Sequence, residues 1–195
     1  MECVAGSKLP GIFCLEGAWA KRLDDRTSVL PTLESLERLR LATYIHRDVG
    51  TEEELYHYLD KWAQAGYRQY GVLFFAFHGI RGSIKVGRGT VTLDDLAVRL
   101  DGKAASRIVY FGSCSVMKDR SGVANFQKAT RAKLVCGYTK DVDWVESSAF
   151  DTILLSRLVE DLRIDARVNR LRARYPDLVT MLGFTNHPQF DRTAK

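Results

Sequence analysis

The sequence predicts an α/β protein, a three-layer sandwich around a mostly parallel, flavodoxin-like sheet of about six strands. Three observations support this fold. Short apolar runs alternate with segments of helical period, which is typical of strands joined by crossover helices. The run at residues 70–77 is almost uniformly apolar, as expected of a central strand covered on both faces. No repeat or linker divides the chain, so we expect one domain of residues 1–195.

Six segments are predicted to be strands because each is a short, largely apolar run bounded by polar or glycine-rich sequence. In chain order they are residues 11–19, 41–49, 70–77, 106–114, 132–139 and 177–184. Four glycines follow the third run, and there residues 83–87 are expected to form a small hairpin arm.

The segments between the strands have helical spacing. The clearest is residues 51–66, where Thr51 and Glu54 form a capping-box pattern, apolar residues share one face, and Gly66 supplies a stop. Further helices are expected at residues 31–40, 93–100, 122–131, 147–162 and 164–175. A polar loop at residues 21–28 separates the first strand from the first helix.

The composition is that of an ordinary globular protein. Of the 195 residues 46% are hydrophobic, and the net charge of +5 permits an acidic partner without requiring one. No run of about 18 apolar residues is present, and the first residues lack a signal-peptide pattern, so we expect neither membrane insertion nor secretion. The four cysteines lack metal-binding spacing. We therefore expect a cytoplasmic protein with no metal, cofactor or disulfide framework.

Chemistry-bearing residues stand at the ends of two predicted strands. His78 follows residues 70–77, and Cys114 closes residues 106–114. Because ligands bind beyond the carboxyl ends of parallel strands, we expect both side chains at one edge of the sheet. A cysteine thiolate is a nucleophile that an imidazole can activate, and the N–H groups of Gly79 and Cys114 can hold an oxyanion. The pattern predicts cysteine peptidase chemistry.

Other functional classes fit the sequence less well. A nucleophile elbow needs a small residue where Val116 stands, and it needs a downstream base, for which His187 alone is left. No P-loop or glycine fingerprint indicates a nucleotide hydrolase. The arginine-rich residues 164–175 have the apolar stripe of a surface helix, so nucleic-acid binding is not expected. A non-catalytic binding module that keeps the His and Cys pair is the alternative.

The order of the two motifs resembles the caspase-like (clan CD) cysteine peptidases, which include caspases, metacaspases, gingipains, separases and bacterial CHAT domains. In that family one apolar run ends in His-Gly and the next in a small residue and Cys, as in "FFAFHG" and "IVYFGSCS". The likeness spans residues 13–184. The "QACRG" of animal caspases and the "DxCHSG" of metacaspases are absent, so the chain is more similar to the CHAT or separase branch.

This resemblance implies a caspase-like endopeptidase with His78 as general acid, Cys114 as nucleophile, and Gly79 and Cys114 as oxyanion donors. Its substrate would be a protein or peptide. CHAT-like members commonly serve bacterial signalling or defence. Because the chain has no evident sensor module, a separate regulatory protein is an expected partner.

The loop at residues 138–146 is the predicted specificity element. Asp141 and Asp143 can pair with a basic substrate side chain, and Trp144 can wall the pocket, which favours cleavage after Arg or Lys. The same residues also fit solvated loop charges and a core tryptophan. Asp119, shortly after the nucleophile, is a further candidate acid.

Overall fold

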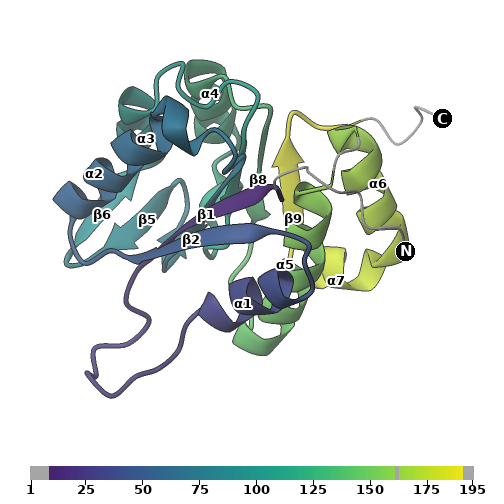
Figure 1. Ribbon diagram of the computed structural model, residues 1–195, viewed down its shortest axis with the longest axis horizontal. Coiled ribbons are helices and arrows are strands. Elements are labelled where there is room, and N and C mark those ends of the chain that lie inside the picture. Colours follow the sequence, from purple (N-terminus) through teal and green to yellow (C-terminus); the bar gives the residue numbers. More distant parts are fainter. Residues whose placement is uncertain (1–8, 161–162, 191–195) are drawn as a thin grey trace.

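The computed structural model describes residues 9–160 and 163–190 of the chain. Within these residues, a six-stranded sheet forms the middle of the molecule (Figure 1). Across the sheet its strands are β2 (Thr43–Asp48), β1 (Gly11–Glu16), β3 (Val72–Ala76), β7 (Ile108–Phe111), β8 (Leu134–Tyr138) and β9 (Phe184–His187). The first five are parallel, and β9 pairs antiparallel with β8. The predicted, mostly parallel sheet is confirmed.

The strand order has a functional consequence. From β2 to β8 it follows the flavodoxin-like order, in which the chain moves outward from β1 to β2 and then returns to the other side of β1. The direction of winding therefore changes between β1 and β3. In open sheets of this kind, ligands bind at such a switch point, outside the carboxyl ends of the strands.

Helices cover both faces of the sheet, which gives the three predicted layers (Figure 1). One face carries α2 (Glu52–Ala63), α3 (Leu93–Arg99) and α4 (Arg120–Thr130). The other face carries α1 (Leu30–Arg38), α5 (Trp144–Leu158) and α6 (Ile164–Arg174), with α7 (Pro176–Met181) beside β9. Among the described helices, none combines the length and the apolar composition that a membrane crossing needs.

Side chains of each strand alternate between two apolar cores. In β1, Phe13 and Leu15 pack with α2, α3 and α4, whereas Ile12 and Cys14 pack with α1 and α5. All four side chains are at most 2% exposed. Because both faces of the sheet are covered, a central strand needs apolar residues at every position. This explains why the β1 and β3 segments show no polar alternation.

Local sequence signals set where several elements begin. The Thr51 hydroxyl accepts a hydrogen bond from the Glu54 N–H (3.2 Å), and the Glu54 carboxylate accepts one from the Thr51 N–H (3.2 Å). This is the predicted capping box, and it opens α2. The glycine-rich segment after β3 forms a small antiparallel sheet of β4 (Gly79–Ile80), β5 (Ser83–Val86) and β6 (Gly89–Thr92). The predicted hairpin is thus part of a three-stranded arm.

The prediction of a strand at residues 177–184 is wrong. Helix α7 occupies most of this segment, and β9 begins only at Phe184. Pro176 suits the first turn of a helix, where no N–H is needed. Gly183 has a φ of +61°, a conformation that favours glycine and ends a helix. A short apolar run does not by itself separate a strand from a helix, which is the cause of the error.

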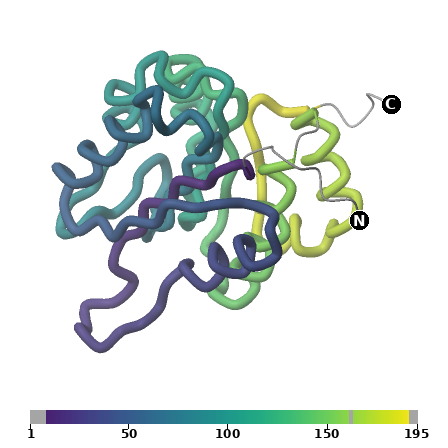
Figure 2. The backbone as a smooth tube through the Cα atoms, in the orientation of Figure 1, coloured from purple at the N-terminus to yellow at the C-terminus, as the bar shows by residue number. Residues whose placement is uncertain are grey.

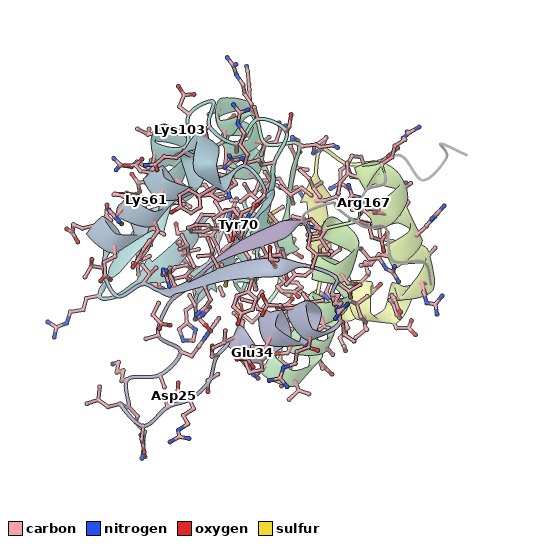
Figure 3. All side chains as sticks on the ribbon, in the orientation of Figure 1. Asp25, Glu34, Lys61, Tyr70, Lys103 and Arg167 are labelled. Atoms are coloured by element: carbon pink, nitrogen blue, oxygen red, sulfur yellow. The ribbon has the colours of Figure 1, made fainter. Side chains whose placement is uncertain are left out.

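Several predicted boundaries also move: α2 ends at Ala63 rather than at residue 66, and β7 ends at Phe111 rather than at residue 114. The first strand ends at Glu16 rather than at residue 19, and α5 begins at Trp144 rather than at residue 147. The last two positions predicted for that helix, residues 161–162, lie outside the described residues. The connection from β1 to α1 projects from the body of the molecule (Figure 2), and Asp25 lies on this projecting loop (Figure 3).

Candidate active site

The parallel strands end at one edge of the sheet, and the predicted catalytic residues follow two of them. His78 lies two residues after β3 ends at Ala76, and Cys114 lies three residues after β7 ends at Phe111. Strands β3 and β7 are direct neighbours, with Phe75 opposite Phe111 in the register. The fold therefore brings the two segments to the same edge.

The His-Gly step packs directly against the turn that carries Cys114. A Cβ atom at Gly79 would overlap the Cys114 carbonyl oxygen and lie 2.8 Å from both Ser113 Cβ and a Val116 methyl group. Ser113 also joins the two segments, because its hydroxyl accepts a hydrogen bond from the Phe77 N–H (3.3 Å). Only glycine permits such a close approach, which gives a physical reason for the glycine beside His78.

Cys114 begins a sharp turn that neighbouring loops hold in place. The next residue, Ser115, has a φ of 57°, a left-handed conformation that is uncommon for residues other than glycine. Its N–H donates to the Lys140 carbonyl (3.0 Å), and its hydroxyl donates to the Asp141 carboxylate (2.9 Å). Such a conformation costs on the order of 1–3 kcal/mol and occurs often at active sites. The Cys114 side chain itself is half-buried.

The other described cysteines are poor nucleophiles by comparison. Cys14 and Cys136 lie inside β1 and β8 and are completely buried. Burial raises the pKa of both thiols well above the ordinary value, and nearby carboxylates raise it further. Cys3 lies outside the described residues. Among the described cysteines, only Cys114 combines access to solvent with a position at the carboxyl edge of the sheet.

Among the described residues, two backbone N–H groups at this edge are not engaged by the neighbouring strand or loop. Lys85 donates its N–H to the His78 carbonyl (2.8 Å), so the next pair, Gly79 and Ile84, is a non-hydrogen-bonded pair of the antiparallel ladder. The Gly79 N–H therefore points away from β5. Within the described part of the chain, the Cys114 N–H donates no hydrogen bond. These are the two predicted oxyanion donors.

The protein fixes which nitrogen of His78 carries a hydrogen. The imidazole is exposed, and its Nε2 lies 2.7 Å from the Trp19 carbonyl oxygen. Since a carbonyl oxygen can only accept a hydrogen bond, Nε2 must donate. The neutral ring then presents Nδ1 as its proton acceptor. No local signal in the sequence marks Trp19 as a site residue.

Trp19 also forms part of an aromatic wall beside the site. Its ring meets the His78 ring edge-on at a centroid distance of 5.2 Å and the Trp144 ring at 4.8 Å. Strands β1 and β8 are three strand spacings apart, about 14 Å. The loops that follow them nevertheless meet through these two tryptophans. Trp144 is half-buried, so it is a wall residue rather than a fully buried core residue.

The three aspartates singled out from the sequence have separate contacts. Asp141 holds the hydroxyl of Ser115, directly after the nucleophile position. Asp143 caps α5, because one carboxylate oxygen accepts hydrogen bonds from the first N–H groups of that helix (2.8 and 3.1 Å). Asp119 accepts a hydrogen bond from Ser121 (3.1 Å) and lies against Gly82 in the arm. Of the three, Asp141 and its loop are tied most directly to Cys114.

A buried carboxylate that the sequence analysis missed lies at the end of β1. Glu16 is 3% exposed. One of its oxygens accepts from the Trp19 indole (2.5 Å) and the Val29 N–H (2.8 Å), and the other from the Ser28 hydroxyl (2.7 Å) and His46 Nε2 (2.5 Å). The only sequence signal was a charged residue closing an otherwise apolar run, "GIFCLE".

The same carboxylate belongs to a group with metal-ligand atoms. Glu16, His46 and Asp48 offer ligand atoms within 4.8 Å of one another. Four hydrogen bonds already use both oxygens of Glu16, so an ion would have to displace them. The arrangement fits an anchor for the loop after β1 better than a metal centre.

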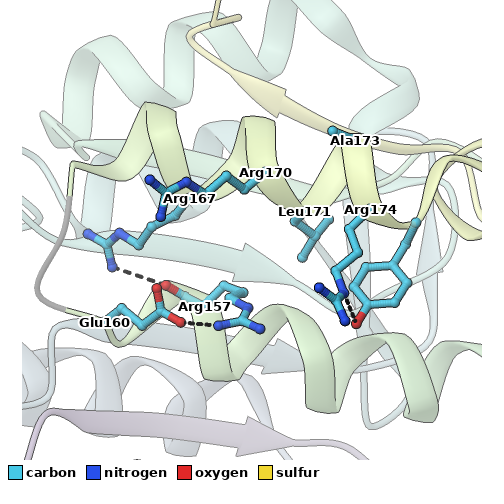
Figure 4. Close-up of a pocket in the computed structure, with 8 residues that line it drawn as sticks. Arg157, Glu160, Arg167, Arg170, Leu171, Ala173 and Arg174 are labelled. Carbon is cyan, nitrogen blue, oxygen red and sulfur yellow. Dashed lines mark hydrogen bonds and ion pairs between the residues drawn. The ribbon is translucent and has the colours of Figure 1, made fainter.

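Two hollows of the surface differ in their distance from the candidate site. One of about 270 Å³ opens at the ends of β1 and β2, and its lining includes Glu16, Trp19 and Asp48. A larger hollow of about 430 Å³ lies between α5 and α6 (Figure 4). Arginines dominate its lining, namely Arg157, Arg167, Arg170 and Arg174. Helix α5 starts at the edge of the sheet that carries His78 and Cys114 and runs away from it, so the larger hollow is remote from these two residues.

Comparison with known proteins defines the family but no activity. The chain matches a family of unknown function, DUF6642, over residues 10–187. The protein belongs to the DUF6642 family. The match begins one residue before β1 and ends with the last residue of β9, so the DUF6642 region contains the whole six-stranded sheet and the candidate site. A search of curated proteins found no match.

Proposed function

We propose that this protein is a cysteine endopeptidase that cleaves peptide bonds with a His78–Cys114 dyad. The observation that carries the proposal is the packing of the His-Gly step on the Cys114 turn at the carboxyl ends of β3 and β7. An imidazole with a defined tautomer, a half-buried thiol and free backbone N–H groups are the parts that acyl transfer requires.

The proposed reaction has two steps. Cys114 Sγ attacks the substrate carbonyl carbon while Nδ1 of His78 takes the thiol proton, and the N–H groups of Gly79 and Cys114 hold the oxyanion. Collapse of this intermediate breaks the peptide C–N bond, and His78 returns the proton to the leaving amine. Water then attacks the thioester, which releases the acid and restores the thiol. No metal or cofactor is needed for this chemistry.

Two features support assignment to the caspase-like group, on the CHAT or separase side. The His-Gly and Ser-Cys steps follow adjacent strands in the expected order, and a β-arm and one helix separate them. The site also lies beside the switch point between β1 and β3. We also propose a cytoplasmic location, a protein or peptide substrate, control by a separate regulatory protein, and no binding to nucleic acid or membrane. The resemblance to CHAT-like members further implies a role in bacterial signalling or defence.

The proposed specificity is for Arg or Lys before the cleaved bond. Asp141 is one hydrogen bond from the residue after Cys114, which puts a carboxylate beside the nucleophile. Asp143 ends the same loop, and Trp144, the first residue of α5, packs against Trp19, which contacts His78. A carboxylate beside an apolar wall suits a long side chain with a cationic end.

The test is cleavage of a peptide panel with Arg, Lys, Asp and Leu before the scissile bond. We expect cleavage after Arg or Lys, and its loss by a factor of at least about 1,000 in Cys114→Ala. The control Cys3→Ala should keep full activity. Thermal unfolding of the purified variants would show that Cys114→Ala is folded. Unchanged turnover in Cys114→Ala would overturn the proposal.

A non-catalytic binding module is the second candidate. Its support is that the carboxylates of Asp141 and Asp143 are engaged by Ser115 and by the start of α5, which leaves them less available to a substrate. Labelling with a peptidyl acyloxymethyl ketone separates the two functions. Stoichiometric modification of Cys114 favours the peptidase, whereas labelling no faster than at Cys3 favours the binding module.

A further inference from the structure

The buried carboxylate of Glu16 is the centre of a hydrogen-bond network. Burial favours the neutral acid and by itself would raise the pKa of Glu16, but hydrogen bonds from His46, Ser28, Trp19 and the Val29 N–H outweigh burial and lower the pKa. Glu16 is therefore a buried anion whose partners come from β2 and from the loop after β1. These contacts fix both ends of that loop to the edge of the sheet.

Trp19 connects this network to the candidate dyad. Its indole N–H donates to Glu16, and its backbone carbonyl accepts the hydrogen of His78 Nε2. Its ring also packs against the His78 ring. Within the described residues, no other hydrogen bond reaches the exposed His78 imidazole. The orientation and the tautomer of the ring thus depend on where the Trp19 backbone is held.

We propose that Glu16 is a positioning residue, which holds Trp19 so that its carbonyl keeps His78 in the Nε2–H tautomer. The catalytic meaning of this role rests on the proposed function. The effect of Glu16 and Trp19 on the His78 tautomer does not depend on that function. Loss of the Glu16–Trp19 bond would release the Trp19 end of the loop after β1, while Ser28 and Val29 would still hold its other end. His78 would then populate the Nδ1–H tautomer, which has no acceptor lone pair at Nδ1.

The decisive variant is Trp19→Phe. It removes the indole N–H but keeps an aromatic ring and the backbone carbonyl, so that folding should be preserved. Glu16→Gln retains an oxygen that can accept from Trp19 and Val29. Glu37→Gln is the matched control, because it removes an exposed carboxylate on α1.

Two measurements apply to each variant: the ¹⁵N NMR signature of the His78 ring at a pH where it is neutral, and kcat and KM for the best panel peptide. We expect Trp19→Phe to show a mixture of tautomers. Its kcat should fall about 10- to 100-fold, because a ring that the Trp19 carbonyl no longer holds also loses its reactive orientation, and KM should change less than kcat because an aromatic ring remains at position 19. Glu16→Gln and Glu37→Gln should keep the Nε2–H tautomer. A pure Nε2–H signal in Trp19→Phe would overturn the inference. Loss of the Nε2–H signal in Glu16→Gln alone would also overturn it, because the effect would then come from the charge of Glu16 and not from its hydrogen bond with Trp19.

The two proposals fail in different ways. A wild-type protein that cleaves no peptide but loses its Nε2–H signal in Trp19→Phe would retain the positioning role and reject the peptidase. An active wild type whose tautomer and kcat are unaffected in Trp19→Phe would retain the peptidase and reject the positioning role.

Discussion

Cys114 and Cys136 belong to the segments of two neighbouring strands, β7 and β8, yet their surroundings differ completely. Cys136 lies inside β8 opposite Tyr110 and is fully buried, and burial raises its pKa. Cys114 lies past the end of β7, where the backbone turns through the left-handed Ser115 and the side chain reaches solvent. The comparison shows that position relative to a strand decides whether a thiol is enclosed in the core or open to solvent.

The largest expected effect is on thiol reactivity. Cys114 should be alkylated by iodoacetamide on the order of 1,000-fold faster than Cys136 in the native protein, because Cys136 reacts only after local opening. Mass spectrometry of peptides sampled over time gives both rates. In denaturant the two rates should become similar. Equal rates in the native protein would remove the distinction between the two regions.

The core between α5 and the sheet has a titratable group, Asp151 of α5, which should govern stability rather than activity. Burial raises the pKa of Asp151 to about 7, although hydrogen bonds from Tyr110 and Tyr138 oppose this rise. The folded protein therefore binds more protons than the unfolded chain between about pH 4 and 7. Its free energy of unfolding should fall as the pH rises through that range, by up to about 4 kcal/mol.

Asp151→Asn tests this expectation because it removes the ionisable group and keeps the shape. Denaturant unfolding at several pH values should show a flatter pH dependence in Asp151→Asn than in the wild type. Asp94→Asn, which changes an exposed carboxyl group on α3, is the control and should keep the wild-type slope. If the unfolding free energy of Asp151→Asn depends on pH as steeply as that of the wild type, the pKa of Asp151 is not raised by burial.

The contact between the two site segments should be sensitive to one methyl group. Gly79→Ala places a Cβ against the Cys114 carbonyl and should cost about 2–3 kcal/mol of unfolding free energy, with slower labelling of Cys114. Gly66→Ala is the matched control, because no atom lies within 4 Å of its added Cβ. Its effect should stay within about 1 kcal/mol, as chemical denaturation would show. A similar loss of unfolding free energy in Gly79→Ala and Gly66→Ala would show that the His-Gly step and the Cys114 turn are not closely packed.

The smallest expected effect separates two roles of Asp143. Asp143→Ala should cost about 1 kcal/mol because it removes the cap of α5, whereas Asp143→Asn keeps a capping oxygen and should be nearly neutral. If the carboxylate also binds a basic substrate, Asp143→Asn should raise KM for Arg peptides about tenfold. Thermal unfolding and peptide kinetics on the same samples measure both. An unchanged KM would leave Asp143 with the capping role alone.

Much of the fold was predictable because its signals are local. The capping box at Thr51 and the apolar runs at β1, β3 and β7 appear in the sequence as they do in the structure. The segment after Pro176 was misassigned because its apolar residues fit a strand and a helix equally well. The positions of His78 and Cys114 at one edge also followed from the sequence, since parallel strands share their carboxyl edge.

The sequence by itself determined the alternation of strands and helices, the two-sided burial of the sheet and the placing of His78 and Cys114 at strand ends. These depend on spacing over a few residues. Only the tertiary structure decided that the carbonyl of Trp19, 59 residues before His78, would accept a hydrogen bond from the His78 ring. It also decided that Glu16 would accept a hydrogen bond from the Trp19 indole. Such contacts depend on how loops from distant strands meet, and no local period in the chain specifies that.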